Sequence, residues 1–599
     1  MKKIIKILFL VLCFFISHLG YNQLSKTHYI PPLGTTSSGS NAPNEQWFHI
    51  STPSENPVNF TIRRGDGSVF SSGSVSNTIP WTNRANLGNS QNDYYGYLFA
   101  SENETDQLLT QHGFIIEADQ EIYVSTRFIS QSNNHGGALV SKGESALGTR
   151  FRAGSLQVGD NGHMSFASFM GTDDNTFVTV TLPDGVQTLT GQTGIINIGP
   201  LIRGQSYVIA VGGTNNPGII GTLIESTKPI VVNSGSGVGT FSPNDFSARG
   251  QDFGVDQIVG DELIGSEYIF VKGNGNNSWE NVLIISNQPN TKINVNGSPF
   301  LNTEGNQIIL NEGEWIIIEG NMFIDGNMYV STDNKDNKLF AYQGMGDIYT
   351  GFNGAYPAAN QGMVFVPPLS CGTSGNVNNI AQIDQVGEGN GSTFDDNAQV
   401  SFVTTKGSTI FVNGLQVNEA EGNVTRNDVF GNNDYESYVI TNLSGNIKVE
   451  SNGEMYVSYY NTNGAASTAG FYSGFTKPPK FEIKSEFSAK GNCVNEDGSS
   501  NIELSAEGSF ASYVWEIKNE LDGTFSSAPG NASANPYSPS QSGTYRLKGV
   551  LECDIELFSD EIRISICPTD FDNDGVIGNI DKDLDNDGLS NFYESRGNG

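Results

Sequence analysis

The chain has 599 residues, 64 aspartate and glutamate residues against 31 lysine and arginine residues, and a formal net charge of −33. So strong a negative charge repels phosphate backbones and anionic lipid surfaces, which argues against nucleic acid and membrane-surface partners. A chain of this length exceeds one hydrophobic core, so we expect several domains. The 71 glycines and 35 phenylalanines favour many short strands joined by tight turns.

Residues 1–22 predict a secretory signal peptide. Lys2, Lys3 and Lys6 form a short basic start, and an apolar run follows from Ile7 to Ile16. This run of about ten residues falls well short of the roughly 20 that a membrane-spanning helix needs. We therefore expect an exported protein that carries no membrane span.

Residues 28–475 predict an all-β region, because short runs alternate apolar and polar residues between glycines, asparagines and prolines. FVTVTL at 177–182 and STIFVNG at 408–414 are examples, and NG after such a run is a hairpin signal. Similar strand-closing phrases recur at intervals of roughly 100 to 125 residues, which predicts four divergent antiparallel modules. Sandwiches and propeller blades both need such strands, and the repeat length favours sandwiches. The closing phrases are EIYVS at 121–125, KPIVVNS at 228–234, NMYVS at 327–331 and EMYVS at 454–458, and a further echo links HYIPPL at 28–33 to VFVPPL at 364–369.

Residues 481–568, after the short linker Lys477–Lys480, have the length of one Ig-like sandwich. They resemble the Ig-like or PKD-like modules of bacterial surface proteins, and Trp515 is expected in the core. The resemblance implies a disulfide between Cys493 and Cys553, which leaves Cys371 and Cys567 with no obvious mates other than each other.

Residues 569–596 contain the pattern D-x-D-x-D-G-x5-[DE] twice in tandem. Calcium takes six to eight oxygen ligands, and alternate carboxylates around a glycine bend supply them, so we expect Ca²⁺ as cofactor. The candidate ligands are Asp570, Asp572, Asp574, the Val576 carbonyl and Asp581 in the first loop, and Asp583, Asp585, Asp587, the Leu589 carbonyl and Glu594 in the second.

The two loops cannot form a pair of EF-hands, because only Lys582 separates Asp581 from Asp583 and leaves no room for a helix. The tail instead resembles thrombospondin type 3 repeats, in which the chain wraps around a row of ions. This resemblance implies a stalk that calcium stiffens.

We find no catalytic constellation: the sequence contains no G-x-S-x-G, H-E-x-x-H or P-loop motif, and no histidine has metal-ligand spacing. We therefore expect a protein that is not an enzyme. A glycosidase needs only two carboxylates, so a carbohydrate-active protein, either lectin-like or a hydrolase, stays an alternative.

The phrases HYIPPL, WFHISTPSENPVNFTI and HGGALVSKGESALGTRFRAG (135–154) resemble large surface proteins of gliding, type 9-secreting bacteria. More distantly, they resemble the N-terminal domain of IgGFc-binding proteins. The resemblance implies a secreted or surface-attached adhesion protein with an extracellular protein or glycan ligand, although immunoglobulin binding does not follow from the name. A structural surface-layer component is a further alternative. Such bacterial proteins usually end in an anchoring domain, so we expect either a further C-terminal domain beyond Gly599 or release from the cell.

Overall fold

The structure is a computed structural model that describes most of the chain between residues 23 and 591. The residues outside its description are 1–22, 36–41, 86–95, 159–162, 214–217, 242–250, 276, 278, 347–360, 371–375, 388–392, 396–397, 477–479, 486–492, 496–497, 501, 508–509, 552–555, 568–570, 573–580 and 592–599. The predicted signal peptide lies among them. The chain divides into two compact units, with the boundary between Lys477 and Pro478.

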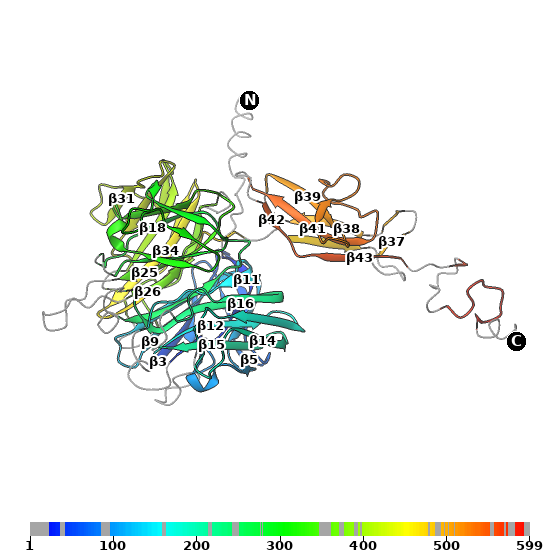
Figure 1. The fold of residues 1–599 in the computed structure, drawn as a ribbon, viewed down its shortest axis with the longest axis horizontal. Helices are drawn as coiled ribbons and strands as arrows, with labels where there is room; N and C mark the ends of the chain where they lie inside the picture. The colour runs from blue at the N-terminus through cyan, green and yellow to red at the C-terminus, as the bar shows by residue number, and fades with distance from the viewer. Residues whose placement is uncertain are drawn as a thin grey trace, which may run out of the picture. The chain divides into compact units, whose positions relative to one another are not determined.

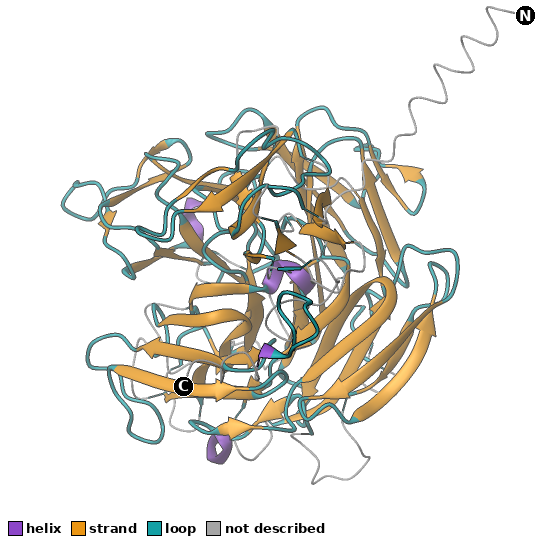
Figure 2. Cartoon of the chain, turned by 90° about the vertical axis from the view of Figure 1, so that its right-hand side faces the viewer, coloured by secondary structure: helices purple, strands orange, loops and turns teal. Residues whose placement is uncertain are grey.

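Strands make up nearly all of the regular structure in the described residues, as Figure 2 shows. The prediction of an all-β protein is therefore confirmed. The described part includes three short 3-10 helices, and its helices include none that is long and apolar enough to cross a membrane. The 3-10 helices are η1 (Glu102–Glu104), η2 (Gly143–Ala146) and η3 (Gly320–Met322).

The first module is a sandwich of two antiparallel sheets that share one long strand, β9. The first half of β9 pairs with β1 and β4, and its second half pairs with β3 and β10. Phe48 of one sheet meets Phe114 of the other edge to face at 5.0 Å, which joins the two sheets in one core. The strands are β1 (Ser25–Ile30), β3 (Pro43–Ser51), β4 (Val58–Arg64), β5 (Val69–Val75), β6 (Trp81–Arg84), β9 (Phe114–Ser130) and β10 (Gly136–Val140).

The second module repeats this arrangement strand for strand, with β16 as the long shared strand. One sheet has the order β15-β12-β16-β17, and the other combines β14, β13, the first half of β16, and β11. The strands are β11 (Gly148–Arg152), β12 (Met164–Gly171), β13 (Thr176–Thr181), β14 (Ile195–Leu201), β15 (Ser206–Gly212), β16 (Leu223–Gly239) and β17 (Asp252–Ile258), and the short strands β2 (Leu33–Gly34), β7 (Phe99–Ala100) and β8 (Leu108–Leu109) lie outside the repeated pattern.

The third and fourth modules keep the same strand order but interrupt the long strand. It is divided into β24 and β25 in the third module and into β33 and β34 in the fourth. Figure 1 follows the modules from blue (β3) to yellow-green (β31). The third module contains β18 (Glu267–Val271), β19 (Val282–Ser286), β20 (Thr291–Val295), β21 (Ser298–Pro299), β22 (Ile309–Leu310), β23 (Trp315–Ile318), β24 (Asn327–Thr332), β25 (Leu339–Gly346) and β26 (Gln361–Phe365). The fourth contains β27 (Asn376–Ile380), β28 (Gln399–Thr405), β29 (Ile410–Val412), β30 (Leu415–Gln416), β31 (Val424–Asp428), β32 (Tyr435–Ile440), β33 (Ile447–Ser451), β34 (Met455–Asn463) and β35 (Ala466–Phe471).

The closing phrases recur once in each module because all four lie in or at the start of one half of its long strand. EIYVS, KPIVVNS and EMYVS lie in or at the start of its second half, in β9, β16 and β34, whereas NMYVS lies in its first half, in β24. The echo between HYIPPL and VFVPPL does not join equivalent strands, since the first begins in β1, the first strand of its module, and the second begins in β26, the last strand of its module.

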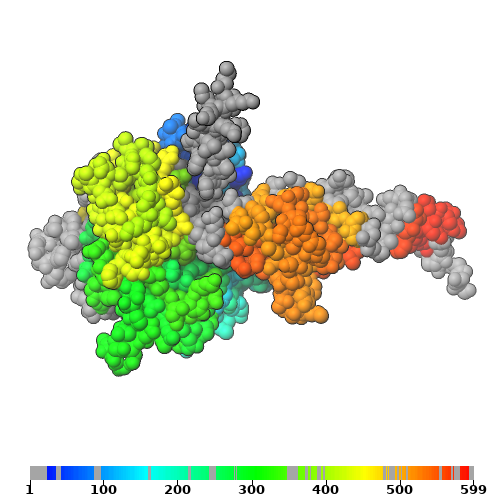
Figure 3. Space-filling model, turned by 90° about the horizontal axis from the view of Figure 1, so that it is seen from above, coloured from blue at the N-terminus to red at the C-terminus, as the bar shows by residue number. Residues whose placement is uncertain are grey.

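The last strands of the four modules lie side by side in a closed ring. β10 lies beside β17, β17 beside β26, β26 beside β35, and β35 beside β10 again. Each module is thus a sandwich, as expected, and the four modules surround an axis in the way that propeller blades do. Figure 3 shows the surfaces of the third (green) and fourth (yellow) modules next to each other.

Two buried aspartates of β17 hold this ring together. Asp252 accepts hydrogen bonds from the Gly136 backbone at 2.6 Å and from the backbone and hydroxyl of Ser467 at 3.1 Å, so it joins β10 to β35. Asp256 forms a buried ion pair of 2.7 Å with Lys142 and accepts the Phe365 N–H at 2.7 Å. A buried charge persists only when it is paired and hydrogen-bonded, and Asp256 meets that condition through neighbouring modules. Asp252 has hydrogen bonds alone, and burial raises the pKa of its carboxyl well above the ordinary value.

The second unit contains an Ig-like sandwich. Trp515 is fully buried in β39, where it stacks on Tyr537 and meets Phe481 edge to face, so its predicted core position is confirmed. Tyr545 donates its hydroxyl hydrogen to the Gln541 carbonyl at 2.7 Å, in the manner of a tyrosine corner. The strands are β36 (Lys480–Ser485), β37 (Cys493–Val494), β38 (Ile502–Glu507), β39 (Ser512–Lys518), β40 (Phe525–Ser527), β41 (Gly543–Val550), β42 (Glu556–Phe558) and β43 (Ile562–Ile566).

The disulfide of this unit joins Cys493 to Cys567, so the expected pair of Cys493 with Cys553 is wrong. The physical reason is a parallel pairing of β37 with β43, in which the Cys567 N–H donates to the Val494 carbonyl at 2.8 Å. This pairing places the Cα atoms of Cys493 and Cys567 4.8 Å apart. The sequence left the partners of Cys371 and Cys567 open, and the structure pairs Cys567 with Cys493. Cys371 and Cys553 lie outside the described residues.

Candidate metal centre

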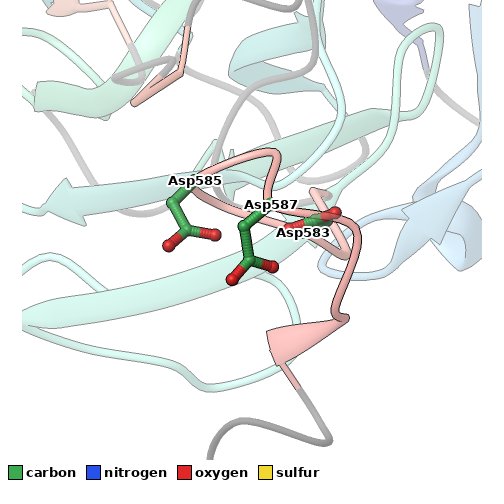
Figure 4. Close-up of side chains that lie close together, drawn as sticks. All are labelled: Asp583, Asp585 and Asp587. Atoms are coloured by element: carbon green, nitrogen blue, oxygen red, sulfur yellow. The ribbon is translucent and has the colours of Figure 1, made fainter.

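The second aspartate loop gathers three carboxylates in one place. Asp583, Asp585 and Asp587 each present an oxygen within 4.8 Å of the others, and Figure 4 shows the three side chains close together on one loop. Gly588 adopts a φ of 90°, the left-handed conformation that its bend requires, and its N–H donates to Asp583 Oδ2 at 2.8 Å. The three aspartates that the sequence spacing predicted as neighbours therefore lie close together in the structure.

The buried oxygens of this loop fit a hard cation. Asp583 Oδ1 and Asp581 Oδ2 are both buried and have no hydrogen-bond partner among the described residues. A buried carboxylate oxygen without a donor is costly, and a divalent cation is the partner that would satisfy it. Clustered carboxylates also repel one another in the absence of a positive charge.

Asn591 organises the loop, a role that the sequence analysis missed. Its side-chain carbonyl accepts the Leu584 N–H at 2.9 Å, and its amide donates to the Asp581 carbonyl at 3.0 Å. Asn591 stands at the ninth position of the twelve-residue spacing, so counting beyond the aspartates could have found it. Its contacts link the end of the first loop to the start of the second.

The remaining predicted ligands are only partly described. Asp572 and Leu589 belong to the described residues, whereas Asp570, Asp574, Val576 and Glu594 lie outside them.

An array of sandwich modules around a closed ring defines a modular all-β protein. A family described as IgGFc binding protein matches residues 136–461, from β10 in the first module to β34 in the fourth. This match spans more than half of the 599 residues. The chain belongs to the IgGFc-binding protein family. No curated protein matches the chain significantly.

Solved structures resemble the chain only weakly. The N-terminal eight Ig domains of Down Syndrome Cell Adhesion Molecule isoform 1.30.30 are 9% identical, with 86% of this chain and 60% of that structure covered and a TM-score of 0.13. The N-terminal four Ig domains of Dscam1 isoform 4.44 are 9% identical, with coverages of 56% and 81% and a TM-score of 0.12. Alpha-2-macroglobulin of Escherichia coli is 7% identical, with coverages of 87% and 35% and a TM-score of 0.10. TM-scores this low carry no argument about fold or function.

Proposed function

We propose that this chain is an exported, non-enzymatic binding protein that acts in adhesion outside the cell. The family match over residues 136–461 carries the proposal, since the family is described by a binding activity. In this proposal residues 1–22 are a signal peptide, residues 28–475 bind an extracellular protein or glycan, residues 481–568 are an Ig-like spacer, and residues 569–596 are calcium repeats.

The calcium part of the proposal is supported by the second aspartate loop. Asp583, Asp585 and Asp587 would hold the ion, with the Leu589 carbonyl and Glu594 completing the shell. Bound calcium supplies positive charge that offsets the repulsion between the carboxylates. The loop has few buried apolar side chains, so metal binding would contribute most of its folding free energy, as in other small metal-dependent segments.

The calcium test is isothermal titration of residues 23–599 with CaCl₂ after chelation. The triple variant Asp583→Asn, Asp585→Asn and Asp587→Asn should lose one of two bound ions. The control variant Asp184→Asn, Glu304→Gln and Glu421→Gln makes the same change of charge at exposed sites and should keep both. Equal stoichiometry in the wild type and the first triple variant would contradict calcium binding by this loop.

The binding test is a screen of the same chain against arrays of extracellular glycans and purified extracellular proteins. We expect saturable binding to one ligand class that survives chelation of calcium, because the proposed binding region and the calcium loops are separate in sequence. A chain that binds no ligand on either array, but assembles with itself when calcium is added, would replace the adhesion proposal with a structural role.

A further inference from the structure

The chain enters the first module through a closely packed position. Gln23 and Ser25 are 0% exposed, and Leu24 is 6% exposed. Leu24 belongs to a hydrophobic cluster that includes Tyr123 of the first module and residues of the fourth module. A Cβ atom at Gly143 would lie 2.5 Å from Ser25 Cβ and 3.3 Å from the Gln23 carbonyl oxygen, so glycine is required for this close approach. Residue 23 is therefore covered by protein.

The side chain of Gln23 is buried without hydrogen bonds. Its Oε1 and Nε2 atoms are both buried and have no hydrogen-bond partner among the described residues. A buried primary amide without partners costs free energy, because water would otherwise satisfy its acceptor and its two donors. An intact glutamine side chain is therefore an unfavourable group at this place.

Export would add a charge to the same residue. In the proposed function residues 1–22 are removed as a signal peptide, so Gln23 becomes the first residue of the mature chain. The α-amino group of a first residue has an ordinary pKa of about 7.7–8.0 and is mostly protonated at neutral pH. A buried charge is costlier than a buried amide unless it is paired. A mature chain with an unmodified Gln23 would therefore bury two unfavourable groups in one residue.

We propose that the exported chain carries pyroglutamate at residue 23. The α-nitrogen of Gln23, in its free-amine form, attacks Cδ of its own side chain. The Nα–Cδ bond forms, the Cδ–Nε2 bond breaks, and Nε2 leaves as ammonia with one proton from the α-nitrogen. The lactam is uncharged and keeps one N–H in place of the five N–H bonds of an ammonium and a primary amide, so fewer buried donors stay unpaired. This inference rests on the proposed export and adds a modification site to it.

The experiment follows the full chain, residues 1–599, expressed in a bacterium that exports it and purified from outside the cytoplasm. After reduction and chelation of metal, intact mass spectrometry should give the mass of residues 23–599 less about 17 Da, the mass of ammonia. Gln23→Ala should leave a free amine and no such loss, whereas the control Gln120→Ala, at an exposed glutamine, should keep the loss. Pyroglutamyl aminopeptidase should leave the native chain intact but digest a synthetic peptide of residues 23–30 that begins with pyroglutamate, because only the peptide exposes the ring.

The possible results separate the modification from the export on which it rests. Loss of ammonia together with resistance to the aminopeptidase supports the proposal. A mature chain that begins at Gln23 with a free amine overturns the modification and keeps the export. A mature chain that begins at another residue overturns the modification and moves the cleavage site. A chain that keeps residues 1–22 overturns the export as well. Release of residue 23 from the native chain overturns the burial from which the proposal is argued.

Discussion

The buried pair of Lys142 and Asp256 should carry much of the stability of the four-module unit. Their side chains are 0% and 2% exposed, and the ammonium lies 5.1 Å from the ring centre of Phe475. Since Asp256 also accepts the Phe365 N–H, this one pair touches all four modules. Burial lowers the pKa of Lys142 and raises the pKa of Asp256, and each charge partly offsets the effect of burial on the other.

Replacing Lys142 with Met keeps the apolar stem but leaves the Asp256 carboxylate buried without a counter-charge. Removal of one partner from a buried ion pair typically costs about 3–5 kcal/mol, whereas replacement of both is often nearly neutral. We therefore expect Lys142→Met to lower the free energy of unfolding by about 3–5 kcal/mol. The double variant with Asp256→Asn should recover most of this loss, because the amide oxygen can still accept from Phe365.

The assay is urea unfolding of residues 23–599 followed by circular dichroism, with the transition of the C-terminal unit as an internal reference. The control Lys292→Met breaks an exposed ion pair with Asp333, whose side chain is 39% exposed, and should cost less than about 1 kcal/mol. A Lys142→Met variant as stable as the control would refute the reasoning. So would a double variant no more stable than Lys142→Met alone.

Two further predictions concern Glu280 and the disulfide. Glu280 is fully buried, and burial raises its pKa to about 7 against about 4.5 in the unfolded chain. A folded-state pKa above the unfolded value makes folding most favourable below pH 4.5, and about 3 kcal/mol should be lost as the pH rises through 7. Glu280→Gln should remove this slope in denaturation curves measured from pH 4.5 to 8, and an unchanged slope would contradict a protonated Glu280. Cys567→Ser should destabilise the Ig-like unit by about 2–4 kcal/mol because it opens the bond to Cys493, whereas Cys553→Ser should not. Thermal unfolding measures both serine variants, and equal losses of stability in Cys567→Ser and Cys553→Ser would contradict this pairing.

The strand pattern was readable from the sequence because it depends on local alternation and on a phrase that each module repeats. The Tyr123–Val124–Ser125 phrase lies where β9 passes from one sheet to the other, and the phrase in β16 lies at the same point. The phrase in β34 lies at the start of the separate strand that continues the second sheet. Ring closure has no such local signal. Gly136 and Ser467 are 331 positions apart in the chain, and buried Asp252 of the second module accepts hydrogen bonds from both.

The candidate sites differ in the same way. The aspartates of the metal loop follow one another at a fixed spacing, so the sequence alone predicts that their carboxylates cluster. The sequence analysis paired Cys493 with the wrong cysteine because it assumed antiparallel Ig-like strands. The short parallel pairing of β37 with β43 does not follow from that assumption.

The seam between the first and fourth modules closes the series of modules into a ring. Arg127 of β9 is fully buried there and donates to the carbonyls of Ala381, Gln382 and Gln385, all of the fourth module. Charged hydrogen bonds of this kind are strong when they are desolvated, so they hold the two ends of the module series in a fixed relation. A closed ring therefore brings together residues whose positions differ by more than 300, since the side-chain amide of Asn379 donates to the Asn77 carbonyl at 3.1 Å.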